Sequence, residues 1–530
     1  MGVLAAAVLC FPTFAPVHDG IVGYYNDDWA NGIYLHHQVH EALMSGRLDL
    51  SDPEQFFPFG YNPVHSNGGN ILEMLVSGLF RLVAPWPLWL SLAALAWIPL
   101  NALAFIPLGR RLWKEPSTVL AAAATWALFP PTLHQITAGR LTQAALIGVP
   151  LVVAGLLDLS ERSDRKGIAL TAGGWALAGL GYWFNALFIG LLAPAFLVYA
   201  QRSRRMSLMV DLVVSGVLAL LLVSPMLLVV FWPVLTGGQA GGTHISPDAM
   251  PLAFPDALQL MSGQKPGLAD WMPWSCLGGI LASVMLRDRR WWLWFGLGVL
   301  CVVFALGPGQ RIAGEIWRMP YWVPWRLVPG LARMFHPDRW MLVGGLFIAV
   351  LAVGGVASIH RWLVWVVPLG VVAQLALRGR IPLDSWSPSL PDHWAELAAL
   401  PGSEAVIVLP LHGSQLSGQY QWLHGRPLWG GMVEDQPWNH PKAWVEYERK
   451  SPFLSGLRAL SYGREVTLKL AAEEELGLNA DGFGWLVLDH SAWSAKGLGS
   501  TSQAEAEISR VLGGPVHRSS SGLVWRLATE

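Results

Sequence analysis

The chain has 530 residues, of which 53% are hydrophobic and 13% are charged. A soluble domain usually carries about 25% charged residues, so the composition predicts an integral membrane protein. The formal net charge of −1 argues against nucleic acid as a partner, because phosphate binding needs a basic surplus. The three cysteines lie in apolar stretches, and no pair of them predicts a disulfide or a zinc site.

Long apolar runs predict an α-helical polytopic protein with about eleven transmembrane helices. The runs cover residues 2–17, 86–108, 117–132, 142–158, 168–183, 184–200, 207–232, 271–286, 291–306, 341–357 and 361–377. The stretch between 168 and 200 has room for two short helices, or for one long helix with a re-entrant piece. The first run lacks a basic flank and a small-residue cleavage site, so we expect a transmembrane helix there rather than a cleaved signal peptide.

Five short loops rich in Lys and Arg predict the orientation. They begin at Arg110, Arg162, Arg202, Arg287 and His360. With eleven segments all five loops fall on one side, which the positive-inside rule assigns to the cytoplasm. The long first outer loop, residues 18–85, and the tail then face the other side. We therefore expect a multi-pass protein of the inner (cytoplasmic) membrane.

The C-terminal part differs in composition and predicts a small soluble α/β domain outside the membrane. Its apolar runs typical of buried strands are residues 404–410, 484–488 and 523–527. Helices are expected around residues 473–475 and 504–512. The sequence thus predicts a transmembrane domain at residues 1–378 and an extracytoplasmic domain at residues 379–530.

The first outer loop carries an acidic motif, Asn26-Asp27-Asp28-Trp29. Two adjacent carboxylates near a membrane surface are costly unless they are solvated or used. They can serve as a general base or as substrate ligands. Alternatively, Asp28 only caps a helix that we expect from Trp29 to Leu48.

Three histidines follow on the same expected helix. His36 and His40 are four residues apart, a spacing that can hold a metal, whereas His37 lies on another face. Interfacial histidines more often only form hydrogen bonds. We therefore assign no metal ligand, and a divalent metal cofactor stays open.

Basic residues stand at two other places expected on the outer face. Arg140 lies in a short loop, and Arg333, His336 and Arg339 precede the run at 341–357. Guanidinium groups there can pair with a lipid phosphate. The alternative is that they extend to lipid head groups, as interfacial arginines commonly do.

The order of these features resembles the membrane glycosyltransferases of the C-type (GT-C) fold. The resemblance covers most of the chain and rests on motif order more than on any single motif. The motifs that support the resemblance are, in chain order, Asn26 to Trp29, His36-His37, Phe57 to Pro63, Ala138 to Gln143, Phe304 to Pro308 and Val328 to Trp340.

The resemblance implies a polyprenyl-phosphate-linked sugar donor and inverting transfer on the extracytoplasmic face. By it, Asp27 or Asp28 would be the catalytic carboxylate. The substrate-binding residues would be Asn26, His36, His37, Arg140, Arg333, His336 and Arg339. Several family members carry a second acidic residue in the next outer loop, and residues 133–141 here contain none.

Two other classes of function stay open. One is a non-catalytic assembly or scaffold protein with the same fold. The other is a transporter or flippase for a lipid-linked glycan, although the chain shows no internal repeat and its apolar runs are nearly free of charge. The sequence indicates neither the sugar nor whether the acceptor is a glycan, a lipid or a protein.

Overall fold

The computed structural model describes residues 20–46, 51–62, 70–235, 272–284, 289–312, 315–328, 331, 336–411, 420–431 and 440–527. The chain divides into two units. Unit 1 comprises residues 1–24, 70–225 and 244–386, and unit 2 comprises residues 25–69, 226–243 and 387–530. The expected segment at 2–17 lies outside the described residues. The expected boundary at residues 378 and 379 stays a prediction.

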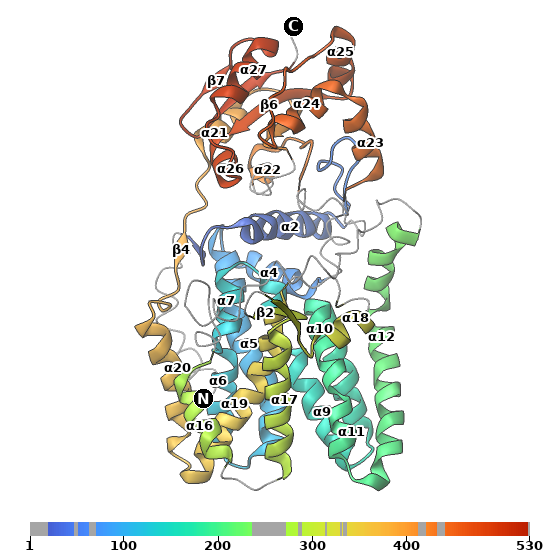
Figure 1. Cartoon of the computed structure of the whole chain (residues 1–530), viewed down its shortest axis with the longest axis vertical. Coiled ribbons are helices and arrows are strands. Elements are labelled where there is room, and N and C mark those ends of the chain that lie inside the picture. Colours follow the sequence, from blue (N-terminus) through green and yellow to red (C-terminus); the bar gives the residue numbers. More distant parts are fainter. Residues whose placement is uncertain are drawn as a thin grey trace. The chain divides into compact units, whose positions relative to one another are not determined.

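Helices make up most of unit 1 (Figure 1). They are α4 (Leu72–Arg81), α5 (Leu88–Leu112), α6 (Pro116–Ala127), α7 (Pro130–Thr137), α8 (Leu141–Ala144), α9 (Gly148–Glu161), α10 (Arg165–Leu192), α11 (Pro194–Tyr199), η1 (Arg202–Arg204), α12 (Arg205–Leu235), α16 (Trp274–Val284), α17 (Arg289–Ala305), α18 (Trp322–Leu327), η3 (Pro337–Arg339), α19 (Trp340–Ile359), η4 (Leu363–Trp365) and α20 (Val366–Leu377). Of these, α12 continues into the part of the chain assigned to unit 2.

Within the described part of the chain, five helical stretches are long and apolar enough to cross a membrane. They are Leu88–Leu112, Leu141–Glu161, Arg165–Tyr199, Arg202–Val229 and Pro337–Ile359. Three shorter apolar helices cover Trp274–Ser283, Trp291–Ala305 and Leu363–Leu377. All eight coincide with apolar runs that the sequence predicts to be transmembrane. The total of about eleven stays a prediction.

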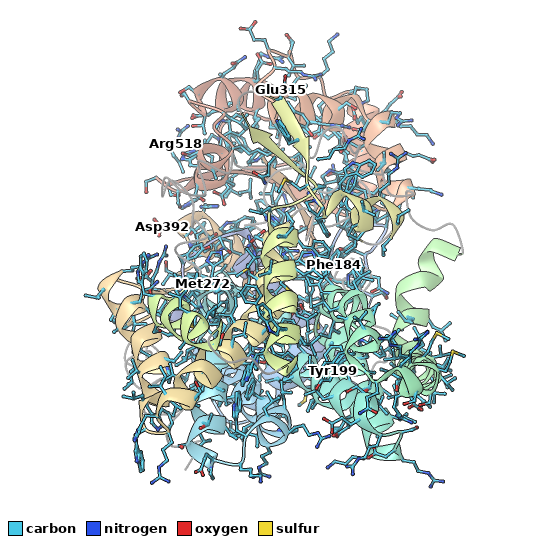
Figure 2. All side chains as sticks on the ribbon, turned by 60° about the horizontal axis from the view of Figure 1, so that its bottom comes forward. Phe184, Tyr199, Met272, Glu315, Asp392 and Arg518 are labelled. Atoms are coloured by element: carbon cyan, nitrogen blue, oxygen red, sulfur yellow. The ribbon has the colours of Figure 1, made fainter. Side chains whose placement is uncertain are left out.

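The stretch between residues 168 and 200 forms α10, which has a break in its middle, and the short helix α11 that follows it. Tyr182, in the middle of α10, has φ −157° and ψ 106°, which is an extended conformation. The break falls next to the expected boundary between the two runs. Figure 2 labels Phe184, just past the break, and Tyr199, the last residue of α11.

Close contact between α9 and α10 depends on glycine. A Cβ added at Gly148 would lie 2.3 Å from the carbonyl oxygen of Gly174, and one at Gly155 would lie 2.7 Å from the backbone nitrogen of Thr171. Small residues let two membrane helices approach backbone to backbone, so that dispersion contacts hold the pair together.

Two short ladders complete unit 1. β1 (Ile21–Val22) pairs antiparallel with β4 (Ser385–Trp386), and β2 (Gly309–Ile312) pairs antiparallel with β3 (Glu315–Arg318). The first ladder joins the segment before the acidic motif to the segment after α20. Two chain segments more than 360 residues apart are thereby fixed side by side.

Unit 2 contains a four-stranded sheet with strand order β5-β6-β8-β7. The strands are β5 (Ala405–Leu409), β6 (Phe483–Asp489), β7 (His517–Arg518) and β8 (Gly522–Arg526); only β5 and β6 pair in parallel. The helices are α2 (Asp27–Met44), α21 (Asp392–Ala399), α22 (Gln421–His424), α23 (Lys442–Lys450), α24 (Pro452–Leu460), α25 (Ala472–Ala480), α26 (His490–Ala495) and α27 (Ser502–Leu512). The three strands and two helices expected from the sequence are confirmed as elements. Their position outside the membrane stays a prediction.

The segment that follows α2 pairs with this sheet. The backbone nitrogen of Leu428 donates to the carbonyl of Glu54 (2.7 Å), and that of Phe57 donates to the carbonyl of Leu428 (3.0 Å). Leu428 in turn forms a parallel bridge with Val406 on β5. Residues near 54–57 therefore extend the sheet edge, and this pairing joins the loop after α2 to the C-terminal part of the chain.

Candidate functional site

The acidic motif forms the start of α2 in unit 2. The Asn26 side chain accepts a hydrogen bond from the backbone nitrogen of Trp29 (2.9 Å), so Asn26 is the N-cap. The expected helix is confirmed as an element, with the bounds Asp27–Met44 in place of Trp29 to Leu48. The alternative that Asp28 caps this helix is wrong, because the helix already begins at Asp27. Asp27 and Asp28 therefore occupy the first turn, where the helix dipole favours negative charge. Asp28 is half-buried, and the Asp27 side chain lies outside the described atoms.

The three histidines of α2 are buried in unit 2. His36 is 1% exposed, and its ring centroid lies 6.1 Å from that of His40. Burial, with smaller contributions from His40 and His37, lowers the pKa of His36 to about 3. His36 is therefore neutral at pH 7. Among the described residues, no group of three His, Cys, Asp or Glu side chains could hold a metal ion.

Asp52 is a buried carboxyl in unit 2 that the sequence analysis missed. The Tyr34 hydroxyl on α2 donates to it, and the backbone nitrogen of Glu54 donates to its Oδ1 (2.8 Å). Burial raises the pKa of Asp52 to about 7. Asp52 thus ties the loop after α2 back onto that helix.

The basic residues of unit 1 gather at the start of α19 and the break in α10. Arg339 Nη1 donates a hydrogen bond to the Tyr182 hydroxyl, and its guanidinium carbon lies 5.5 Å from the centre of the Tyr182 ring. Asp338 interacts electrostatically with both Arg339 and Arg140. The structure therefore brings together Arg140 and Arg339, which the sequence suggested separately, around Asp338 and Tyr182. We call these four residues the Arg339 cluster.

Two further expected phosphate ligands have different outcomes. His336 lies beside the Arg339 cluster, with its Nδ1 3.7 Å from the Asp338 carboxylate and its side chain half exposed. Arg333 lies outside the described residues.

Aromatic side chains hold the Arg339 cluster in place. Trp340 stacks on Phe188 at a centroid distance of 4.2 Å and contacts Phe304 at 4.9 Å and Tyr321 at 5.9 Å. Trp340 and Tyr321 are fully buried. Because Trp340 follows Arg339 directly, this packing restricts where the guanidinium can lie. The two guanidinium groups of the cluster, together with the Tyr182 phenol, suit an anionic group such as a phosphate.

Besides Asp338, a second buried carboxyl lies near the loop of Arg140, and it belongs to helix α4. Glu73 on α4 is 6% exposed and accepts a hydrogen bond from the backbone nitrogen of Thr142, two residues after Arg140. Burial raises the pKa of Glu73 to about 8. Glu73 is therefore mostly protonated at pH 7 and can donate as well as accept a hydrogen bond.

Sequence patterns gave few signals for these additional residues. Asp338 stands inside the motif that supplied Arg339, and its adjacency to that arginine was the available clue. Tyr182 stands at the boundary between two apolar runs, where a break in the helix was one of the open alternatives. For Glu73 and Asp52, only the folded chain shows that the carboxyls are buried.

Two solved structures are similar to this chain over 99% of its residues. One is the arabinofuranosyltransferase AftD from Mycobacteria (mutant R1389S), with a TM-score of 0.57 and 15% identity. The other is ArnT from Cupriavidus metallidurans in the apo state, with a TM-score of 0.55 and 14% identity, covering 97% of that chain. The present chain spans 41% of the AftD chain. No family model and no curated protein matches the sequence.

The likeness shows which fold the chain has. AftD and ArnT both have the GT-C fold. This chain is therefore a membrane protein of the GT-C fold, as the order of its sequence motifs predicted.

Proposed function

We propose that this protein is a glycosyltransferase that takes a sugar from a polyprenyl-phosphate-linked donor. The observation that carries the proposal is the Arg339 cluster, in which Arg140 and Arg339 both interact with Asp338 beside Tyr182. The cluster stands at the first turn of a candidate membrane-spanning helix, where a lipid-linked phosphate would arrive. The GT-C fold, shared with an arabinofuranosyltransferase, is consistent with this activity.

The proposed reaction is a single displacement. An acceptor hydroxyl oxygen attacks the anomeric carbon, and its proton passes to Asp27 or Asp28 acting as general base. The bond between the anomeric carbon and the phosphate oxygen breaks, and the electron pair stays on the lipid phosphate. Attack opposite to the leaving group inverts the configuration. Asn26, His36 and His37 would orient the acceptor or the sugar through hydrogen bonds.

The lipid phosphate needs charge stabilisation more than protonation, because it is already a good leaving group. Arg140 and Arg339 would supply that stabilisation, with His336 and Arg333 nearby in the sequence. Tyr182 and Asp338 would hold the guanidinium groups in place before the donor binds. Preorganised charge of this kind costs no reorganisation during the reaction.

The proposed location is the inner membrane, with transfer on its extracytoplasmic face. The loops rich in Lys and Arg support this orientation through the positive-inside rule. Residues 379–530 would then lie outside the cytoplasm. The sugar and the acceptor stay unassigned, and the acceptor is a glycan, a lipid or a protein.

The experiment compares purified wild-type protein with an Arg140→Gln/Arg339→Gln variant. Each is incubated with radiolabelled polyprenyl-phospho-sugars, and donor binding and release of sugar from the lipid are measured. An Arg361→Gln variant is the control, because Arg361 is an exposed arginine of the same unit in the turn before η4. We expect the double variant to lose donor binding and release, while the control keeps both. Wild-type binding by the double variant would contradict the proposed role of the Arg339 cluster.

A further inference from the structure

A pocket in unit 1 lies apart from the Arg339 cluster. Its volume is about 70 Å³, and its apolar wall comes from Leu133 on α7 and from Val371 and Leu375 on α20. Arg378 and Arg380, just past the end of α20, line it on the polar side. No residue of the Arg339 cluster lines this pocket.

Backbone hydrogen bonds build the pocket. The nitrogen of Tyr24 donates to the carbonyl of Thr137 at the end of α7 (3.1 Å). The nitrogen of Gly23 donates to the carbonyl of Asp384 (2.6 Å), next to the β1–β4 ladder. Gly23 has φ +101°, and a Cβ added there would lie 2.0 Å from the Thr137 carbonyl oxygen. A glycine is therefore required for the three segments to meet.

Gln374, a pocket residue on α20, is hydrogen-bonded to a second helix, α16. The side-chain oxygen of Gln374 accepts a hydrogen bond from the backbone nitrogen of Trp274 (2.8 Å), where α16 begins. This contact fixes the last turn of α20, which ends at Leu377. The two arginines that follow are thus attached to a fixed helix end.

The charge of the lining favours an anion. Arg378 and Arg380 are exposed, and the lining residues include a single carboxylate, Asp384. His134 on α7 adds a further polar group to the lining of the pocket. Two guanidinium groups beside one carboxylate leave net positive charge, and guanidinium groups bind phosphate oxygens through paired hydrogen bonds.

The apolar helix that precedes Arg378 favours a lipid as the anion. Val371 and Leu375 belong to an apolar helix, and Arg378 follows it at the level where lipid head groups would lie. An arginine that only extends toward head groups needs no pocket beside it. We propose that this pocket binds the phosphate of an anionic lipid, with one lipid chain along Leu369 and Leu377, which are exposed on α20. The proposal concerns binding alone and does not rest on the proposed transfer reaction.

The test measures lipid binding to the full-length protein in a nonionic detergent by native mass spectrometry. The probes are short-chain phosphatidylglycerol, a short-chain polyprenyl phosphate and phosphatidylcholine as the neutral lipid. The variant is Arg378→Gln/Arg380→Gln, and Arg361→Gln is the matched control. We expect at least one anionic probe to bind about tenfold more weakly to the double variant than to wild type and control. Phosphatidylcholine should not distinguish the three proteins.

The pattern among probes identifies the source of the phosphate. Loss confined to phosphatidylglycerol supports a bulk membrane lipid, and loss confined to the polyprenyl phosphate supports a carrier lipid. An Arg378→Lys/Arg380→Lys variant keeps the charge and should retain part of the binding, which separates loss of the site from loss of the fold. Equal binding by wild type and the Gln variant would overturn the proposal, as would an equal loss in the Arg361→Gln control. Competition by inorganic phosphate as strong as by the lipids would overturn the role of the lipid chain.

Discussion

The Arg339 guanidinium donates a hydrogen bond to the Tyr182 hydroxyl across a separation of 157 residues. This contact joins the short η3 helix before α19 to the break in α10. Because Tyr182 is extended, the helix around it is interrupted at the place where the arginine arrives. The proposed donor site thus depends on an irregularity of the helix.

Removing the Tyr182 hydroxyl tests that dependence. Tyr182→Phe keeps the ring but deletes the acceptor of the Arg339 hydrogen bond, so the guanidinium loses one restraint. We expect donor affinity to fall about five- to tenfold, the effect of one hydrogen bond worth about 1 kcal/mol, in a direct binding titration. Tyr199→Phe on α11 is the control and should bind normally. Unchanged affinity in Tyr182→Phe would show that the contact does not position Arg339 for the donor.

The sequence anticipated part of this site. Arg140 and Arg339 were suggested because each stands near the end of an apolar run, where an arginine can reach lipid phosphate. Their convergence on Asp338 could not be predicted, because nothing in the spacing of two loops 199 residues apart indicates that they meet. The role of Tyr182 could not be predicted either, because an apolar run does not indicate which of its residues will leave helical geometry.

The contact between α9 and α10 gives a prediction about stability. In Gly148→Ala, the new methyl group would lie 2.3 Å from the Gly174 carbonyl oxygen and 2.4 Å from the Ala178 nitrogen. Both neighbours are backbone atoms, so the helices must move apart. We expect a loss of about 1–3 kcal/mol, the usual range for overpacking, seen as a lower melting temperature in detergent.

A matched control is available on α10, next to Gly174. Gly173→Ala on α10 adds the same methyl group where no other atom lies within 4 Å. It should leave the melting temperature unchanged or raise it slightly, because alanine is the better helix former. Equal destabilisation by both variants would contradict the account, because the methyl group added at Gly173 meets no neighbouring atom and improves helix propensity.

Phe56 anchors the segment after α2 in unit 2. It is fully buried and contacts the rings of Tyr61, His440 and Trp444 at centroid distances of 5.0, 5.5 and 5.3 Å. We expect Phe56→Ala to destabilise unit 2 by about 3–5 kcal/mol, the usual cost of deleting a buried phenylalanine. The measurement is the rate of limited proteolysis. Phe59→Ala, which removes a ring that is 39% exposed, should digest at nearly the wild-type rate.

Asp52 makes stability depend on pH. The pKa of Asp52 is about 7 in the folded protein, above the value near 4 usual for an unfolded aspartate. Between about pH 4 and pH 7, Asp52 therefore keeps its proton in the folded state but loses it in the unfolded state. This contribution to stability is complete below about pH 4 and disappears as pH rises through 7. The free energy of unfolding should thus fall between pH 5 and pH 8.

The variant Asp52→Asn tests this pH dependence. Asparagine resembles the protonated carboxyl and can still accept the hydrogen bond from Tyr34. We expect its melting temperature to change less between pH 5 and pH 8 than that of wild type. Asp481→Asn, which alters an exposed carboxylate bonded to Tyr447, should keep the wild-type pH dependence. An equally steep decline in Asp52→Asn would assign the titration to another group.

The elements of unit 2 show where prediction from sequence reaches its limit. The apolar runs at 404–410, 484–488 and 523–527 became β5, β6 and β8, because a buried strand needs continuous apolar residues. The two-residue strand β7 is too short to leave such a pattern. The pairing of Glu54 and Phe57 with Leu428 uses only backbone atoms, so no side-chain pattern could reveal it. For that reason the sequence assigned the first outer loop to the transmembrane domain.

The most direct test of the proposed transferase is release of sugar from radiolabelled polyprenyl-phospho-sugars, with and without EDTA. Wild-type protein is compared with an Asp27→Asn/Asp28→Asn variant of equal monodispersity in detergent. We expect wild type to release sugar from at least one donor, and the variant to bind that donor but release none. The EDTA arm decides whether a divalent metal takes part. Equal release by both proteins would contradict the assigned carboxylates, and neither binding nor release of any donor by wild type would contradict the transferase proposal and favour the scaffold alternative.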